Sequence, residues 1–488
     1  MKDDNISQAV RDEAKMKSSW NLLDSSGKLT PVKLEGGKIS GYNLSKYPRL
    51  EKFAMYEIAK SRDADKEPPH VELMKKLELV DYEPGSDPGN VRYYPKGKLI
   101  KSLIEAYVSR TMAEYGAMEV ETPIMYDMEH PTLKSYLNRF PARQYTVQSP
   151  NKELFLRFAA CFGQFLMAHD ATFSYKDMPL KLYELTRYSF RAEKRGELTG
   201  LRRLRAFTMP DCHALCTGEE QAKSELYSRF KLAIKLQKGI GIEKADMELG
   251  IRLVRSFWDK NKDFVMKLVR EWGRPVLVEL WDQQFFYFIL KYEFNFVDGL
   301  GKASALTTDQ IDVENGKTYK ITYVAKDGSK KHPYILHLSP SGAIERVMYT
   351  LLEKAAFDMK QGKKPTLPTW LAPTQVRLCP VSDKFNRDCE KIADELAGES
   401  IRTDIDDRQE TIGKKVRDSS REWVPYTIVF GDREKKSKKL PARQQKDGSV
   451  KNISIRELAE LIHGETAGMP FRPLNLPRNL SKRPIFRG

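Results

Sequence analysis

The stretch RYSFRAEKRGELTGLRRLRAFTMPDCH, residues 187–213, has the pattern of a strand, a polar loop and a second strand. The loop is rich in Glu, Lys, Arg and Gly, which favour an exposed turn between paired strands. We therefore predict a β-hairpin in which side chains of the returning strand alternate between the two faces of a sheet. Alternation places six residues on one face: Arg203, Arg205, Phe207, Met209, Asp211 and His213.

That face would make a poor protein core because it combines guanidinium, carboxylate, imidazole and aromatic groups. It suits a nucleotide and an ammonium group instead, since guanidinium binds phosphate, a ring stacks on a base and a carboxylate binds an amine. Arg191 and Glu193 stand at the end of the first strand and extend this set. On spacing alone, a salt-bridged surface hairpin is the alternative interpretation.

The segments on either side of the hairpin also carry clear patterns. Upstream, residues 96–115 repeat apolar side chains at the helical period, and the strand-like AMEVETPIM follows at 117–125. Pro123 cannot donate a hydrogen bond to a ladder, which places it at a sheet edge or an interface. Downstream, SPSGAIERV at 339–347 has a small-residue turn that leads into a helix containing Arg346.

Residues 140–345 otherwise mix short β-like runs with helices. This order fits an antiparallel sheet that carries helices better than a parallel sheet. Two helical stretches, 218–239 and 259–272, are interpreted as insertions in this sheet.

Three residues of metal-ligand type occur in separate segments: Cys161 in FAACFGQF, His213 in the hairpin and His337 in ILHLSP. A thiolate and two imidazoles suit Zn²⁺, and a working zinc site keeps its fourth position open. Simple packing of a buried Cys or His is one alternative, and a local metal group of Cys212, His213 and Cys216 is another. Alternation argues against the local group, because Cys212 and His213 point to opposite faces of the strand.

Together these segments resemble the class II aminoacyl-tRNA synthetases. The hairpin, at about 183–213, resembles motif 2, residues at about 96–125 resemble the dimer-forming motif 1, and residues at about 339–350 resemble motif 3. The three metal-type residues narrow the resemblance, which covers about residues 45–460, to the threonyl-tRNA synthetases. It implies an α/β (α+β) fold, with a catalytic domain on an antiparallel sheet flanked by helices, a C-terminal α/β anticodon-binding domain, and a homodimer.

The resemblance also implies a reaction and its residues. Arg191 and Arg346 would serve catalysis by facing the α- and γ-phosphates of ATP, which is bound with Mg²⁺, before the threonyl group passes to tRNA(Thr). One Zn²⁺ per subunit, held by Cys161, His213 and His337, would read the threonine hydroxyl, which an apolar pocket distinguishes poorly from the methyl group of valine. The implied ATP-binding residues are Arg191, Glu193, Arg203, Phe207 (under the adenine), Gln310 and Arg346, and the implied threonine-binding residues are Asp211, Tyr287, Lys291 and Gln310.

Two of these assignments leave alternatives open. Tyr287 lies in FFYFILKYEF, which departs from the usual family segment, so that either aromatic neighbour fits the same role. Lys291 is equally consistent with a phosphate contact and with plain surface charge.

The Pro-rich segment LPTWLAP, residues 367–373, is the clearest linker in the chain. Beyond it, strand and helix patterns alternate as βαβαβ, which is typical of a compact α/β domain. The resemblance implies that Gln409, Glu434 and Arg443 contact anticodon bases, although the family often has Asn where Gln409 stands. The predicted domains are an N-terminal extension at 1–45, the catalytic domain at 46–366 and the anticodon-binding domain with a basic tail at 374–488.

Composition limits the classes of protein to consider. The 488 residues carry a net charge of +16, which favours a polyanionic partner, although a charge-rich surface of the heat-stable type is an alternative. Five scattered cysteines favour a reducing, cytoplasmic setting over a disulfide framework. The start of the chain lacks the apolar core of a signal peptide, and the sequence contains no apolar run of about 18 residues that would predict a membrane span.

Fewer than 100 residues precede the motif 1 helix, and they contain His70 but no cysteine. The threonyl family usually carries an N-terminal domain that removes misattached serine. We therefore expect no editing in cis, as in the archaeal forms that rely on a separate trans-editing protein. Deacylation of seryl-tRNA by this chain alone tests the expectation, and efficient clearance would contradict it.

Two other functions compete with this interpretation. One is a non-catalytic tRNA-binding paralogue, which usually loses motif arginines or metal ligands, whereas this chain retains them. The other is a class II synthetase for serine or proline.

Overall fold

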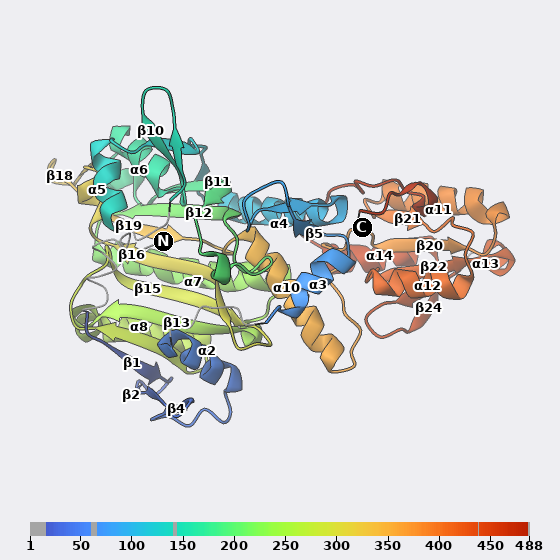
Figure 1. Ribbon diagram of the computed structural model, residues 1–488, viewed down its shortest axis with the longest axis horizontal. Coiled ribbons are helices and arrows are strands. Elements are labelled where there is room, and N and C mark those ends of the chain that lie inside the picture. Colours follow the sequence, from blue (N-terminus) through green and yellow to red (C-terminus); the bar gives the residue numbers. More distant parts are fainter. Residues whose placement is uncertain (1–15, 60–65, 140–143, 438, 487–488) are drawn as a thin grey trace. The chain divides into compact units, whose positions relative to one another are not determined.

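The computed structural model describes residues 16–59, 66–139, 144–437 and 439–486 (Figure 1). Its contacts divide the chain into two compact units, each with its own sheet and core. We call residues 1–67, 88–90 and 108–347 unit 1, and residues 68–87, 91–107 and 348–488 unit 2. In the part of the chain that is described, no helix is both long enough and apolar enough to cross a membrane.

A ten-stranded sheet in the order β2-β1-β14-β13-β15-β16-β19-β12-β11-β7 forms the centre of unit 1. Its neighbours are antiparallel except for the pairs β13–β14 and β11–β7, so the predicted antiparallel sheet is confirmed. The edge strands β1 and β2 come from the segment predicted as an N-terminal extension. The strands are β1 (Ser18–Leu23), β2 (Leu29–Pro31), β7 (Met118–Glu119), β11 (Leu180–Phe190), β12 (Ala206–Cys216), β13 (Met247–Val254), β14 (Val276–Trp281), β15 (Phe288–Val297), β16 (Ala303–Asp312) and β19 (Tyr334–Leu338).

Two long helices, α7 (Glu219–Ile240) and α8 (Arg255–Trp272), cover one face of this sheet (Figure 1). Phe230 of α7 packs against Tyr292 and Phe294 of β15. The interpretation of these stretches as insertions is wrong, because their apolar side chains recur at helical spacing and are buried against the strands.

The other face of the sheet carries α2 (Pro48–Ala59), whose Phe53 lies over Gly250 of β13. Further along this face, α6 (Cys161–Asp170) and a small three-stranded sheet enclose an aromatic core around Phe162 and Phe165. The smaller elements of unit 1 are β3 (Lys33–Glu35), β4 (Lys38–Ser40), β8 (Met125–Asp127), α5 (Pro131–Arg139), β9 (Thr146–Gln148), β10 (Glu153–Leu156), α9 (Asn315–Thr318), β17 (Tyr323–Val324) and β18 (Lys330–Lys331).

Unit 2 is built on a five-stranded sheet in the order β21-β20-β22-β23-β24. Strands β20, β21 and β22 are parallel and alternate with α11 and α12, which confirms the predicted βαβαβ order. Helix α14 begins with a capping box, in which Ser454 and Glu457 satisfy each other's backbone N–H groups. The elements are α3 (Pro69–Lys76), β5 (Val80–Tyr82), β6 (Val91–Tyr93), β20 (Val376–Pro380), α11 (Asn386–Gly398), β21 (Thr403–Ile405), α12 (Ile412–Arg421), β22 (Tyr426–Phe430), α13 (Asp432–Ser437), β23 (Leu440–Gln444), β24 (Val450–Ile453) and α14 (Ile455–Thr466).

The segments predicted as the helices of motifs 1 and 3 are helical. The first is α4 (Pro95–Glu114), and the second is α10 (Ile344–Lys360). The strand predicted at 117–125 is shorter, because only Met118–Glu119 and Met125–Asp127 pair with neighbours. Pro123 falls in the gap between them, where no ladder hydrogen bond is required.

Glu248 of β13 is a buried carboxyl group whose ionisation opposes folding. Burial raises its pKa to about 7, although Arg274 lies 3.9 Å away. In the unfolded chain the carboxyl ionises near 4.5, so stability is lost as the pH rises from about 4.5 to about 7. Replacing Glu248 with Gln should therefore stabilise the protein at pH 8, by about 2 kcal/mol, with the gain disappearing below about pH 5. Arg274 keeps its hydrogen bonds to the carbonyl oxygens of Lys244 and Met247.

Thermal unfolding of both forms between pH 5 and pH 8 measures this difference. An equal change in Tm at every pH would contradict the assignment of the effect to ionisation.

Candidate active site

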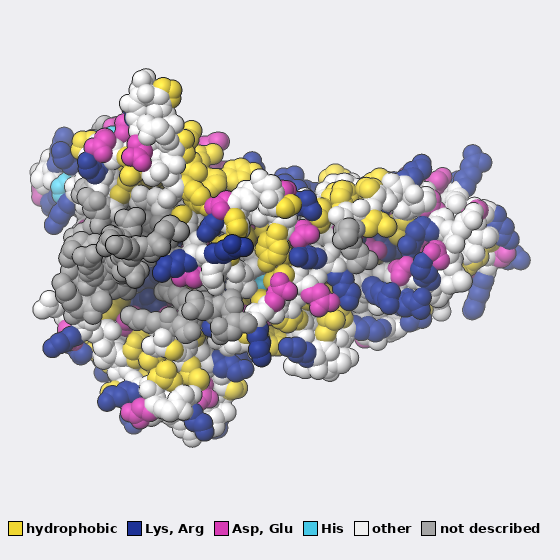
Figure 2. Space-filling view, viewed as in Figure 1, with side chains coloured by type: hydrophobic (Ala, Val, Ile, Leu, Met, Phe, Trp, Pro, Cys, Tyr) yellow, Lys and Arg dark blue, Asp and Glu magenta, His cyan; other side chains and the backbone are white. Residues whose placement is uncertain are grey.

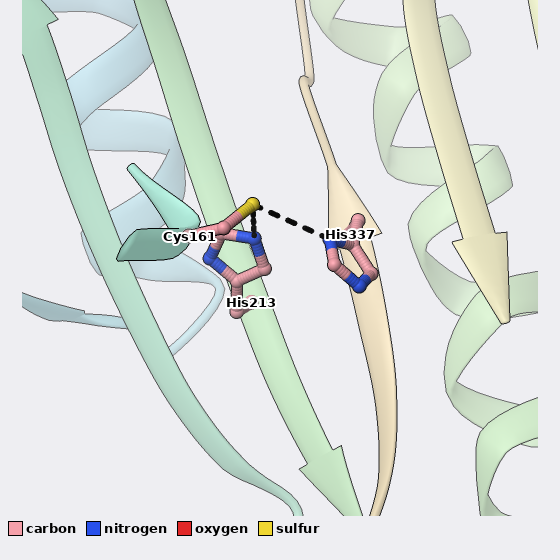
Figure 3. A group of neighbouring side chains, drawn as sticks. All are labelled: Cys161, His213 and His337. Atoms are coloured by element: carbon pink, nitrogen blue, oxygen red, sulfur yellow. Dashed lines mark hydrogen bonds between the residues drawn. The ribbon is translucent and has the colours of Figure 1, made fainter. Parts of the chain in front are cut away.

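Cys161, His213 and His337 come together on one face of the unit 1 sheet (Figure 3). Cys161 is the first residue of α6, while His213 lies on β12 and His337 on β19. The two histidines are direct partners in the antiparallel register, which makes both rings project from the same face. The Cys161 Sγ atom lies 3.2 Å from His213 Nε2 and 3.6 Å from His337 Nδ1.

These separations fit one tetrahedral metal ion. With Zn–S near 2.3 Å and Zn–N near 2.0–2.1 Å, tetrahedral geometry requires about 3.6 Å between sulfur and nitrogen. All three ligand atoms lie within 4.8 Å of one another, and all three residues are buried. The three residues predicted from separate segments therefore form a compact Cys-His-His cluster that is compatible with a metal ion.

Two further side chains fix the orientation of the imidazoles. Gln164 Oε1 lies 2.8 Å from His213 Nδ1, and Asp312 Oδ2 lies 2.8 Å from His337 Nε2. Each histidine thus donates through its outer nitrogen and turns its other nitrogen toward Cys161. Burial, together with the neighbouring His337, lowers the pKa of His213 well below its usual value, which favours the neutral form that binds metals.

Gln164 and Asp312 were not identified in the sequence. Gln164 stands three residues after Cys161 on the same helix, so the helical period was a usable signal for it. Asp312 reaches His337 through a side-chain hydrogen bond from the neighbouring strand β16, and local sequence carries no signal for such a contact.

Cys212 lies on the opposite face of β12, as alternation predicts. Its carbonyl oxygen accepts a hydrogen bond from Arg229 of α7, and burial raises the pKa of its thiol to about 11. Among the described residues, the cluster that can hold a metal includes neither Cys212 nor Cys216. The alternative of a local metal group at residues 212–216 is therefore wrong.

A cavity of about 210 Å³ lies beside this cluster and contains several residues assigned to ATP. The guanidinium of Arg191 lies 5.7 Å from the ring centre of Phe207. Arg346 donates from Nε to the carbonyl oxygen of Arg202 and from Nη1 to that of Ala305. Burial lowers the pKa of Arg346 to about 10, and the like charges of Arg191 and Arg203 act in the same direction. A group of cations at such close range favours an anionic ligand.

The turn before Arg346 requires glycine at position 342. Gly342 has a φ of +73°, and a Cβ atom there would lie 2.3 Å from the carbonyl oxygen of Leu306. The next residues begin α10, where Glu345 accepts a hydrogen bond from the backbone N–H of Thr208. This contact joins the segment resembling motif 3 to the strand resembling motif 2.

The polar loop of the hairpin is organised by Glu193. Its carboxylate lies 2.9 Å from Arg203 Nη2, and its carbonyl oxygen accepts two hydrogen bonds from Arg205. Strand β12 begins only at Ala206, so strand alternation does not extend to Arg203 and Arg205 as predicted. Arg203 forms ion pairs with Glu193 and Glu197, and it lines an adjoining cavity of about 280 Å³ rather than the 210 Å³ cavity.

The residues assigned to threonine fall into two groups. Tyr287 donates a 2.6 Å hydrogen bond to Gln310, and its ring centre lies 5.3 Å from that of His337. Asp211 accepts a hydrogen bond from the N–H of Ala160, and burial raises its pKa to about 6.

Lys291 differs from this group because its Nζ lies 2.6 Å from Glu293 in the wall of the ATP-side cavity. The structure thus brings Tyr287, Gln310 and His337 together and places Lys291 in the wall of the cavity that Arg191 and Arg346 also line.

In unit 2, two of the residues assigned to the anticodon follow the carboxyl ends of parallel strands, and the third lies on the antiparallel strand β23. Gln409 is exposed in the loop after β21, and Glu434 lies in α13, after β22. One carboxylate oxygen of Glu434 accepts a hydrogen bond from the N–H of Gly431, so it also caps the local turn. Arg443 is exposed on β23, and its Nη1 donates to the carbonyl oxygen of Gly448. Lys and Arg side chains gather over α12, α13 and β24 on the face seen in Figure 2.

Comparisons with known proteins match both units. The model of the tRNA synthetase class II core domain (G, H, P, S and T) matches residues 145–355, and an anticodon binding domain matches residues 375–465. A threonine–tRNA ligase of Pyrococcus horikoshii is 55% identical over 100% of this chain and 77% of its own length. One from Nitrosopumilus maritimus is 52% identical over 99% of this chain and 76% of its own length.

The chain belongs to the threonine–tRNA ligase family. Solved structures of related synthetases share its fold. A structure titled as the RNA binding domain of threonyl-tRNA synthetase from Cryptosporidium parvum has a TM-score of 0.70 at 22% identity, over 85% of this chain and 99% of its own. A prolyl-tRNA synthetase from the same organism has a TM-score of 0.64 at 16% identity, over 81% and 76% of the two chains. The class II core of this synthetase contains the Cys-His-His cluster, the hairpin and Arg346.

Proposed function

We propose that this class II synthetase activates threonine with ATP and transfers the threonyl group to the 3′ end of tRNA(Thr). The observation that carries the proposal is the Cys-His-His cluster, which stands beside a cavity lined by Arg191 and Arg346. Such a set serves both substrates, because the cluster suits a small amine with a hydroxyl group and the arginines suit a nucleotide.

Cys161, His213 and His337 would hold one Zn²⁺ ion, which supplies a Lewis-acid position for the amino and hydroxyl groups of threonine. The separations of the three ligand atoms and the fixed orientations of both imidazoles support this assignment. Valine lacks the hydroxyl group, and a site that demands it rejects such an analogue far better than an apolar pocket does. Tyr287, hydrogen-bonded to Gln310 and close to His337, would close the pocket around the side chain.

Asp211 would hold the ammonium group of threonine. It projects from β12 two residues before His213, and so from the same face of the strand. The N–H of Ala160, directly before Cys161, fixes one oxygen of its carboxylate. The other oxygen is then oriented for the substrate, so that binding requires only small movements of the site.

ATP would bind with its adenine on Phe207 and its phosphates among Arg191, Arg203 and Arg346. An oxygen of the threonine carboxylate attacks the α-phosphorus, the bond to the β-phosphate oxygen breaks, and pyrophosphate leaves with the electron pair. Arg191 stabilises the charge that develops on the α-phosphate, while Arg346 holds the far end of the Mg²⁺-bound triphosphate. The terminal ribose hydroxyl of the tRNA then takes the threonyl group, and AMP is released.

Unit 2 would bind the anticodon. Exposed Gln409 and Arg443 offer polar edges to unpaired bases, and the surrounding lysines offer salt-sensitive phosphate contacts. Glu434 has one oxygen engaged with Gly431, which leaves the other for a base. Gln409 stands where the family often has Asn, and its side-chain amide offers the same donor and acceptor groups to a base.

A homodimer through the motif 1 segment is part of this proposal. Met118, Ile124 and Met125 of that segment are each between 41% and 49% exposed. Several exposed large apolar side chains within one short segment are typical of an interaction surface. A second copy that covers them would remove this surface from water. Sedimentation of the purified chain measures the mass, and a monomer at micromolar concentration would contradict this part of the proposal.

Amino-acid-dependent ATP–pyrophosphate exchange tests the function directly. Threonine should support exchange, serine should support it less well, and valine should support it at least about 10³-fold less well than threonine. Exchange with proline alone would favour a class II synthetase for proline. No exchange with any amino acid would favour a non-catalytic tRNA-binding paralogue. Charging of tRNA(Thr) transcripts then tests the second step.

A further inference from the structure

A second cavity, of about 280 Å³, adjoins the ATP-side cavity in unit 1. The two cavities share Arg202, Lys291, Glu293, Ala305 and Arg346, so one continues into the other. The far wall of the second cavity comes from the N-terminal segment, through Trp20 of β1 and Tyr56 and Glu57 of α2.

A row of side chains across five neighbouring strands contributes to the walls of both cavities. In the register of the sheet, Gln310 pairs with Lys291, Lys291 pairs with Arg252, Arg252 pairs with Glu279, and Glu279 pairs with Trp20. Cross-strand partners project from the same face. The row therefore leads from Gln310, next to the metal cluster, past the phosphate side of the ATP cavity to Arg252.

The charges of the second cavity suit an anion. Five cationic side chains line it, against the three carboxylates of Glu57, Glu279 and Glu293. The Nε atoms of Arg202 and Arg203 are buried and have no hydrogen-bond partner, and Arg202 is only 6% exposed as a whole. Buried donors of this kind are costly to leave unsatisfied, which favours an anionic ligand with several acceptor oxygens.

Arg252 is held at the centre by carboxylates from three elements. Its Nη2 lies 2.5 Å from Glu57 of α2 and 4.0 Å from Glu293, and its Nε lies 3.4 Å from Glu279. Its guanidinium also lies 6.0 Å from the ring centre of Trp20. Trp20 of β1 and Glu57 of α2 thus help to fix the orientation of the Arg252 guanidinium in the wall of the cavity.

We propose that this second cavity receives the pyrophosphate released by adenylate formation and that Arg252 is a further phosphate-binding residue. The inference rests on the proposed function, in which Arg346 holds the far end of the triphosphate. Because Arg346 lines both cavities, pyrophosphate can move from one to the other without losing its contact with that guanidinium. Pyrophosphate carries Mg²⁺, which binds one or two carboxylates together with phosphate oxygens, so the acidic side chains beside Arg252 fit the same ligand. Glu57 acts as a positioning residue, because it orients Arg252 from helix α2.

The test is the KM for pyrophosphate in threonine-dependent exchange, measured for the full chain and for Arg252→Gln. Loss of a charge-assisted contact should raise this KM about ten- to hundredfold. The KM for threonine should change by less than about twofold, because Arg252 lies at the other end of the row. Arg252→Lys, which keeps the charge but not the planar fork, should restore part of the affinity.

Arg255→Gln is the matched control. Arg255 follows Arg252 by three residues, pairs with Asp282 at 3.1 Å, and does not line either cavity. Its replacement should leave the KM for pyrophosphate unchanged. An unchanged KM in Arg252→Gln, or an equal rise in Arg255→Gln, would overturn the proposal.

Calorimetric titration with inorganic pyrophosphate and Mg²⁺ separates this inference from the proposed function. It requires neither threonine nor turnover, and thermal unfolding of each variant shows that the fold is intact. The unchanged chain could fail to catalyse exchange with any amino acid and still bind pyrophosphate more tightly than Arg252→Gln. That result would support the pyrophosphate pocket and contradict the proposed function. Equal binding by the two proteins would overturn the pocket assignment even if threonine activation were intact.

Discussion

Replacing Cys161 with Ala is expected to remove the bound metal and to lower kcat/KM for threonine activation by about 10³-fold or more. The substitution removes the one thiolate of the cluster and leaves two neutral imidazoles, which hold Zn²⁺ much more weakly. Alanine is accommodated at the first residue of α6, so the fold should persist. Metal analysis of the purified protein and threonine-dependent ATP–pyrophosphate exchange measure the two effects.

Cys212→Ala is the matched control for this experiment. Cys212 is as buried as Cys161 and lies one residue before His213, but it faces the Arg229 side of the sheet. This variant should retain the metal and activate threonine normally. ATP affinity should also be unchanged in Cys161→Ala, because Arg191, Phe207 and Arg346 do not depend on the cluster. Full metal content in Cys161→Ala would contradict the assignment of the site.

Replacing Arg191 with Gln is expected to lower kcat for adenylate formation by about 10²- to 10³-fold, with little change in the KM for threonine. Its guanidinium lies over the Phe207 ring, 5.7 Å from the ring centre, and its buried Nε has no hydrogen-bond partner. Burial lowers its pKa, as expected for a cation whose counter-charge arrives with the substrate. Single-turnover formation of the adenylate measures the effect separately from product release.

Arg187→Gln provides the comparison for that prediction. Arg187 lies four residues before Arg191, within β11, and is exposed at the irregularity of that strand between Thr186 and Ser189. It should have no effect on adenylate formation. An equal loss of activity in both variants would contradict a specific role for Arg191. It would indicate instead that positive charge in this region assists ATP binding in general.

Much of the site follows from local sequence because its residues lie at positions that a single strand or turn decides. Alternation along β12 places Phe207, Met209, Asp211 and His213 on one face and Cys212 on the other, and the structure has this arrangement. The small-residue turn before Arg346 is likewise a local feature, since only glycine tolerates the φ of position 342 and the contact with Leu306.

Features that depend on pairing between distant strands could not be predicted in this way. Asp312 reaches His337 only because β16 lies beside β19, and the row from Gln310 to Arg252 exists only in the register of three strands. Alternation also failed at Arg203 and Arg205, because hydrogen bonds to Glu193 hold them in the loop before the strand begins.

The long helices α7 and α8 were misjudged for a related reason. Their apolar faces were visible in the sequence, but the strand faces that they bury include β16 and β19, which lie far downstream in the chain. The packing of Phe230 against Tyr292 and Phe294 makes α7 part of the core of unit 1.

If the Cys-His-His cluster binds Zn²⁺ as proposed, the direct pairing of His213 with His337 makes metal binding depend on the correct alignment of β12 and β19. If β19 slid by one position along β12, His337 would turn toward α7 and the triad would be lost. Misaligned chains are then unable to capture zinc, whereas correctly aligned ones gain its binding free energy. On the proposed zinc assignment, scarcity of zinc during synthesis would therefore weaken the preference for the native alignment, in addition to impairing the proposed selection of threonine.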